Sequence, residues 1–155
     1  MSSHEAFMRR CIELAREAGK SKDTRVGSVV VLDGDIVGQG VESVKAKTDL
    51  TAHAEIEAIK AACARLKTTN LKACVLYTTA EPCFMCSYVI RQARMSEVVI
   101  GRPVPGIGGV SSKHPILTDP SVENWTSPPK VITGILQEEC EELLRIPSAV
   151  TIHRV

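Results

Sequence analysis

The sequence predicts a layered α/β fold, because segments with helical and strand patterns alternate along its 155 residues. Apolar residues recur at helical spacing in residues 4–18, and two strand-like runs that flank Asp33-Gly34 have the pattern of a tight hairpin. Further along, the strand-like segment 73–79, apolar over residues 73–77, lies between two stretches with helical spacing. No internal repeat and no linker separates these segments, so we expect one domain over residues 1–155.

Local signals support the individual elements. Ser2 and Glu5 could form a capping box at the start of the first helix, and Gly19 could end it. Pro82 stands where a first-turn proline belongs in a later helix. In chain order we expect a helix at 4–18, strands at 26–32 and 35–41, a helix from 54 to about 66, a strand at 73–79, a helix at 82–94, strands at 97–101 and 130–133, and a helix near 136–144.

Three stretches have no clear helix or strand pattern. Residues 42–51 are polar and contain lysines, and we expect them to form a loop that enters the functional site. Residues 101–129 hold six of the eight prolines and the only tryptophan, Trp125. They could be a disordered insertion, but a structured loop over the site is favoured, because several apolar residues could pack it down. The tail 146–155 is apolar enough to dock, for example on a partner subunit.

Composition limits the classes of function. The net charge of +1 gives no bulk electrostatic attraction to nucleic acid or membrane. The chain has no apolar run of about 18 residues and no signal-peptide core near its start, so we expect a cytoplasmic protein without membrane contact. The cysteines fit a reducing compartment rather than a disulfide framework. Four of them are expected to be small buried hydrophobes, namely Cys11, Cys63, Cys74 and Cys140.

Cys83 and Cys86 are the strongest chemical signal in the sequence. They lie one helical turn apart at the predicted start of a helix that follows a strand. The amide groups and dipole of that helix would favour thiolate over thiol. A Cys-x-x-Cys pair alone is also typical of redox sites and structural zinc sites. His53 adds an imidazole, and three such ligands leave a fourth tetrahedral position for water, as in a catalytic zinc site. Glu55 would then be a general acid and base rather than a ligand.

His53-Ala-Glu55, followed 26 residues later by Pro82-Cys-Phe-Met-Cys86, resembles the signature of the zinc-dependent cytidine/nucleobase deaminase superfamily. Residues 51–59, 76–82 and 134–140 resemble its branch of guanine, cytosine and tRNA adenosine deaminases, and the likeness covers roughly residues 5–145. The resemblance implies a three-layer α/β/α sandwich with a five-stranded mixed sheet, a zinc-dependent deaminase domain and a homodimer.

The resemblance also implies roles for individual residues. His53 would bind Zn²⁺ through a neutral ring nitrogen, with Cys83 and Cys86 as thiolates, and the metal would lower the pKa of bound water toward about 7. Glu55 would pass the water's proton to a ring nitrogen and then to the leaving amine. The backbone amides of Ala54 and Cys83 would support the water or the intermediate.

Three positions depart from the pattern of this branch. Glu42 stands where these deaminases usually carry a substrate-binding asparagine, and an ionised glutamate only accepts hydrogen bonds. If Glu42 enters the pocket, the substrate should present a donor there; otherwise it is an exposed loop charge. Arg25 replaces a proline before the first strand. Phe84 replaces a proline within Cys-Pro-x-Cys and could line the pocket, although packing in the core is favoured.

We therefore expect a hydrolytic deaminase of a free nucleobase or related amino-heterocycle, guanine-, cytosine- or triazine-like. Zinc hydroxide would attack the amino-bearing ring carbon and release ammonia. A tRNA-specific adenosine deaminase is the alternative, although near-neutral charge and few aromatic residues count against it. A local basic stripe of Arg91, Arg94, Arg102 and Lys113 would favour RNA. A non-catalytic structural zinc or redox module is the third hypothesis, and under it the spacing of Glu55 from His53 would be a coincidence.

Overall fold

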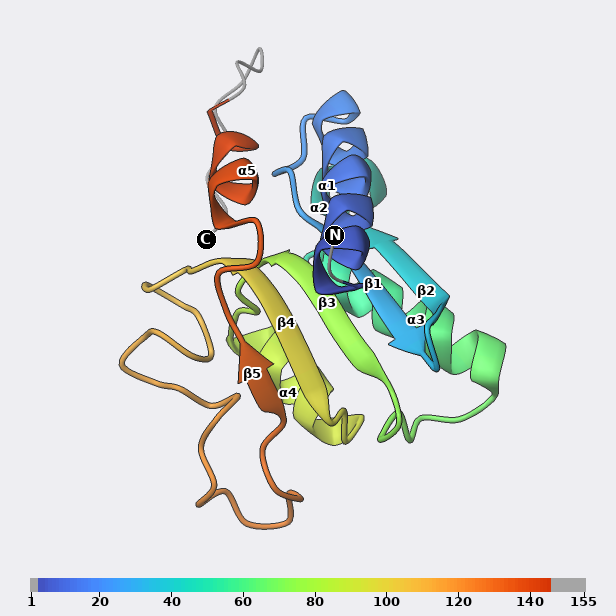
Figure 1. Cartoon of the computed structure of the whole chain (residues 1–155). Helices are drawn as coiled ribbons and strands as arrows, with labels where there is room; N and C mark the ends of the chain where they lie inside the picture. Colours follow the sequence, from blue (N-terminus) through green and yellow to red (C-terminus); the bar gives the residue numbers. More distant parts are fainter. Residues whose placement is uncertain (1–2, 146–155) are drawn as a thin grey trace.

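A five-stranded sheet with strand order β2-β1-β3-β4-β5 lies at the centre of the structure, a computed structural model that describes residues 3–145 (Figure 1). β1 pairs antiparallel with β2 and β3, whereas β3, β4 and β5 run parallel, so the sheet is mixed. The strands are β1 (Gly27–Leu32), β2 (Asp35–Val41), β3 (Val75–Ala80), β4 (Glu97–Arg102) and β5 (Lys130–Ile132). The predicted capping box at Ser2 and the tail 146–155 lie outside the described residues.

Helices cover both faces of this sheet. α1 and α5 lie on the face turned toward the viewer in Figure 1, and α3 and α4 lie behind it. The helices are α1 (Ser3–Lys20), α2 (Val44–Lys47), α3 (Ala54–Leu66), α4 (Phe84–Gln92) and α5 (Gln137–Glu142). This confirms the predicted three-layer α/β/α sandwich. Within the described part of the chain, every helix is too short or too polar to cross a lipid bilayer.

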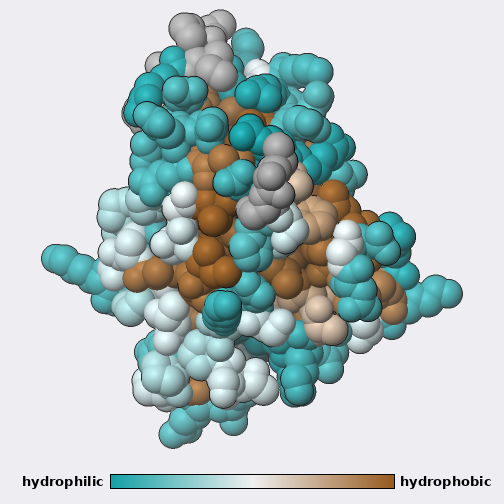
Figure 2. Space-filling model, in the orientation of Figure 1, coloured by the Kyte–Doolittle hydropathy of each residue, from teal (hydrophilic) through white to brown (hydrophobic). Residues whose placement is uncertain are grey.

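Two hydrophobic cores lie on opposite sides of the sheet. Side chains alternate along β1, so Val29 and Val31 pack with α1 while Val30 packs with α3. Both faces of β1 are buried, which explains its continuous run of valines. On the α1 and α5 side, apolar surface remains visible between hydrophilic helix surfaces (Figure 2).

Close packing fixes the start of α3 against the sheet. A Cβ added at Gly40 would clash with the carbonyl oxygen of Ala54, and one added at Gly38 would clash with that of Ala58. α3 therefore lies directly on β2, and the glycines allow this approach. As a result, the first turn of α3 is held at the edge of the sheet where β3 ends.

Two local elements differ from the sequence prediction. α4 begins at Phe84, because Cys83 is extended (φ −70°, ψ −179°) and occupies the N-cap, so Pro82 precedes the helix instead of opening its first turn. Residues 42–51 contain the short helix α2, which the polar sequence did not predict. The buried Asp23 stabilises it, because its carboxylate accepts hydrogen bonds from the backbone N–H groups of Lys45 (2.7 Å) and Ala46 (3.1 Å).

Candidate active site

The predicted metal ligands meet at the carboxyl end of β3. His53 is the N-cap of α3 and Cys83 is the N-cap of α4, so the amino ends of two helices converge there. Cys86 follows in the first turn of α4 and is fully buried. Helix amino ends carry partial positive charge, which favours thiolates at this place.

The spacing of the three side chains fits a tetrahedral zinc ion. Nδ1 of His53 lies 3.6 Å from Sγ of Cys83 and 3.6 Å from Sγ of Cys86. A tetrahedral zinc with ordinary Zn–N and Zn–S bonds would separate such atoms by about 3.6 Å. All three donor atoms lie within 4.8 Å of one another. The donor set is that of an open catalytic site, with three protein ligands and one remaining position.

The thiol of Cys83 is strongly acidified in the metal-free protein. Its pKa falls from 9.0 to about 3, mainly through the side-chain hydrogen bond with Cys86 and secondly through the one with His53. Burial, which disfavours the charged form, opposes this shift. Cys83 is therefore a thiolate at neutral pH, the form that binds metal.

Glu55 lies beside this group in the first turn of α3 and is fully buried. Its Oε2 lies 3.5 Å from Sγ of Cys86, and its Oε1 lies 3.3 Å from the hydroxyl of Thr78. The Thr78 hydroxyl also lies 3.0 Å from the carbonyl oxygen of Ala80. The carboxylate is thus held next to the metal ligands, where a proton shuttle would be needed. Thr78 had no predicted role, because a threonine in a strand is ordinary in sequence.

Glu42 lies in the same site. It is 3 % exposed, and its Oε1 accepts a hydrogen bond from the backbone N–H of Ala54 at 2.9 Å. A Glu42 carboxylate oxygen, a His53 ring nitrogen and a Glu55 carboxylate oxygen lie within 4.8 Å of one another. The alternative of an exposed loop charge is therefore wrong. The Ala54 amide, which the resemblance assigned to the water or the intermediate, donates to Glu42 in this structure.

Phe84 does not occupy the core position that the sequence favoured, and Arg25, for which the sequence predicted no position, lies near the end of α5. Phe84 is half-buried outside the hydrophobic clusters, and its ring packs edge-on against His114 with the centroids 5.9 Å apart. The favoured core position for Phe84 is not found, because α4 starts at this residue and its side chain meets the loop after β4. Arg25 donates a hydrogen bond to the carbonyl oxygen of Leu143 at 3.4 Å, which ties the end of α5 to the segment before β1.

Glu81 anchors the loop after β4, a role that no sequence pattern indicated. It is 2 % exposed, and its carboxylate accepts hydrogen bonds from the backbone N–H groups of Val104, Val110 and Ser111 and from the Ser111 hydroxyl. In addition, Gly109 donates its N–H to the carbonyl oxygen of Pro82. Residues 103–111 are thereby fixed against the metal-binding motif.

Arg91 anchors the rest of that loop. Its guanidinium donates hydrogen bonds to the carbonyl oxygens of Ile116, Leu117, Asp119 and Thr126. The structured loop predicted for residues 101–129 is therefore confirmed.

The predicted basic stripe does not form, because two of its four residues are buried. Arg91 and Arg102 are only 4 % and 8 % exposed, so neither can present its charge to RNA, whereas Arg94 and Lys113 are exposed.

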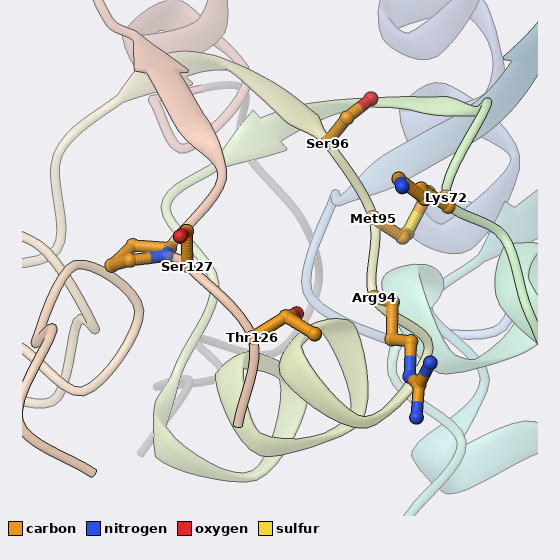
Figure 3. A pocket seen from close by; sticks show the side chains of 7 residues that line it. Lys72, Arg94, Met95, Ser96, Thr126 and Ser127 are labelled. Carbon is orange, nitrogen blue, oxygen red and sulfur yellow. The ribbon is translucent and has the colours of Figure 1, made fainter. Parts of the chain in front are cut away.

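A separate open pocket of about 340 Å³ lies beyond the carboxyl end of α4, away from the metal ligands (Figure 3). Arg94, Met95 and Ser96 form one wall with Lys72, and residues 126–128 form the other. Its lining shares no residue with the candidate active site, so the two are separate features of the surface.

Comparison with known proteins identifies the family. Residues 1–102 match the cytidine and deoxycytidylate deaminase zinc-binding region. A tRNA-specific adenosine deaminase of Agrobacterium fabrum is 34% identical over 94% of this chain and 93% of its own length, and one of Aquifex aeolicus is 38% identical over 77% and 80%. A solved tRNA:A34 deaminase, studied for A-to-I editing at the wobble position of transfer RNA, superimposes with a TM-score of 0.83 at 34% identity, covering 90% of this chain and 99% of that one. The guanine deaminase of Nitrosomonas europaea gives 0.73 at 27% identity, covering 91% and 82%.

These relatives correct the expected substrate. The sequence favoured a free nucleobase, yet the curated relatives that match over most of both chains are named as tRNA-specific adenosine deaminases. Near-neutral net charge was a poor guide, because net charge does not describe how charge is distributed over a surface. The zinc-binding signature, the deaminase resemblance and the fold are all confirmed. The chain belongs to the zinc-binding cytidine and deoxycytidylate deaminase family, and is a zinc-dependent deaminase that hydrolyses a C–N bond.

Proposed function

We propose that the chain converts adenosine to inosine in tRNA, at the wobble position of the anticodon. The observation that carries this proposal is the likeness to tRNA adenosine deaminases over nearly the full length of both chains, in sequence and in structure. The guanine deaminase of Nitrosomonas europaea is less similar by TM-score and by identity. A guanine deaminase of Bacillus subtilis is 39% identical, but the match covers only 66% of each chain, with a TM-score of 0.63.

The site supplies the groups that this reaction needs. His53, Cys83 and Cys86 would hold zinc, which when bound acts as a Lewis acid and lowers the pKa of a water molecule to about 7. Glu55 would take a proton from the attacking water and transfer it to N1 of adenine and then to the 6-amino group. The C6–N6 bond breaks and ammonia leaves, so adenosine and water give inosine and ammonia.

Features around the site are compatible with a single-stranded RNA loop. The half-buried ring of Phe84 and the exposed ring of His114 meet directly after the metal ligand Cys83. Unpaired RNA bases commonly stack on phenylalanine and histidine rings. Lys113 is exposed beside His114 and could contact a phosphate group. A single domain over residues 1–155, a homodimer and a cytoplasmic location stay predictions.

The test is inosine formation by the purified, zinc-loaded protein. The substrates are an anticodon stem-loop RNA with adenosine at the wobble position, the same RNA with that adenosine moved into the stem, and free adenosine, guanine and cytosine. We expect inosine only in the first RNA, formed at least about 100-fold more slowly with E55Q. Ammonia release from a free base, with no inosine in the RNA, would refute the proposal.

A further inference from the structure

Glu42 is held in a fixed position at the end of β2. Its backbone N–H donates to the carbonyl oxygen of Val26 at 3.1 Å, and Ser43 donates to the carbonyl oxygen of Ala52 at 2.9 Å. The side chain is buried and accepts a hydrogen bond from the Ala54 N–H. The carboxylate therefore cannot swing out to solvent without breaking that bond.

A buried carboxylate needs compensating donors, because leaving water costs free energy. The Ala54 N–H supplies one at the start of α3, where the helix dipole also favours negative charge. A carboxylate has about four acceptor positions, so Glu42 can accept from a further donor. Its oxygen lies within 4.8 Å of atoms of His53 and Glu55, which places it in the candidate active site.

The chemistry of Glu42 limits what that donor can be. An ionised glutamate accepts hydrogen bonds and donates none. An adenosine within an RNA chain has only two kinds of strong donor, the 6-amino group and the ribose 2′-hydroxyl, because its other hydroxyl oxygens are esterified. The 6-amino group is the leaving group and must face the metal ligands and Glu55. The 2′-hydroxyl is then the donor left for Glu42.

We propose that Glu42 accepts a hydrogen bond from the 2′-hydroxyl of the target adenosine and thereby makes the enzyme selective for ribose over deoxyribose. This inference rests on the proposed function. Carboxylates bind ribose hydroxyls in this way in dinucleotide-binding sites, and the 2′-hydroxyl is the group by which proteins distinguish RNA from DNA. A single hydrogen bond to a charged acceptor corresponds to about a 10- to 100-fold preference.

The experiment uses three anticodon stem-loops that differ only at the 2′ position of the target nucleotide, which carries a hydroxyl, a hydrogen or a fluorine. Fluorine retains the ribose-like sugar pucker but cannot donate a hydrogen bond. Single-turnover inosine formation is measured for wild type, E42Q, E42A and the control E57Q. Glu57 also lies in the first turn of α3, but it pairs with Lys47 instead of facing the metal ligands.

We expect wild type and E57Q to prefer the hydroxyl over both analogues by about 10- to 100-fold. The preference should fall below about tenfold in E42Q, which keeps a neutral acceptor for Ala54, and approach one in E42A. Each ratio compares one protein with itself, so losses from misfolding or zinc release cancel. The inference would be overturned if wild type deaminated all three RNAs at equal rates, or deaminated the fluorine RNA as fast as the hydroxyl RNA. An E42A preference for the hydroxyl RNA equal to that of wild type would also overturn it. Absence of inosine from the hydroxyl RNA would instead refute the proposed function.

Discussion

Replacing Glu81 should destabilise the protein more than its single charge suggests. The side chain is 2 % exposed and satisfies four donors in the loop after β4, from Val104, Val110 and Ser111. A Cβ added at Gly108 would overlap the Glu81 carboxylate, so the loop backbone passes directly over it. In E81A these partly buried donors lose their buried acceptor.

The magnitude follows from which donors each variant leaves unpaired. In E81Q the amide oxygen can replace Oε2, which accepts from the N–H groups of Val110 and Ser111. The amide NH₂ then faces the Ser111 hydroxyl, which can rotate to accept, and the Val104 N–H, which cannot. One orphaned N–H corresponds to about 1–3 kcal/mol. In E81A all four donors lose their partner, and we expect a loss of about 3–5 kcal/mol.

The assay is urea-induced unfolding at a constant excess of zinc, because bound metal itself stabilises the folded state. E123Q serves as the control: Glu123 is exposed in the same loop, and a surface change of this kind should alter stability by less than about 0.5 kcal/mol. If E81Q and E81A both unfold within 0.5 kcal/mol of wild type (about the size of a surface effect), Glu81 does not anchor the loop.

Three further predictions concern the metal site. E55Q should keep its zinc but lose about 10²–10⁴-fold in single-turnover rate, because the proton shuttle is removed while the ligands remain; zinc loss would make Glu55 a ligand. C86A should contain far less than one zinc per chain by elemental analysis, and stoichiometric zinc would exclude Cys86 from the ligand set. In the metal-free protein the pKa of Cys83 falls from 9.0 to about 3, chiefly through its hydrogen bond with Cys86. The thiolate therefore stabilises the folded state fully above pH 9 and not at all below about pH 3. The difference in unfolding free energy between metal-free wild type and C83A should therefore shrink as pH falls through this window, and a constant difference would refute the shift.

Most of the fold could be predicted because its elements have local signals. The period-2 and 3.6 patterns located the sheet strands and their covering helices, and the Asp33-Gly34 turn adopts positive φ at both residues, as a tight hairpin requires. α2 could not be predicted, because it depends on the Asp23 carboxylate, which is distant in sequence. The predicted position of Pro82 was wrong by two residues, because a proline is compatible with both N1 and the residue before the N-cap.

The candidate site also contains residues that could be predicted from the sequence and one that could not. His53, Glu55, Cys83 and Cys86 form a spaced motif, and the structure brings them together, although their roles stay predictions until tested. Glu81 has no such signal, because an acidic residue before a proline gives no hint that it will be buried under a loop. Its partners lie 23 to 30 residues away, and only the tertiary fold brings them to it.

The near-neutral net charge, which argued against RNA, hides an uneven distribution of charge. The helix α5 has the sequence QEECEE and therefore carries four glutamates, while the rest of the chain has a net charge of +5 within the total of +1. α5 lies on the face of the sheet opposite α3 and α4, whose amino ends hold the site (Figure 1). Exposed charges are screened over about 10 Å at ordinary salt, so the proposed RNA would respond most to exposed cations close to the site, such as Lys113. A single number for the whole chain could not have shown this, because the separation of the charges is created by the fold.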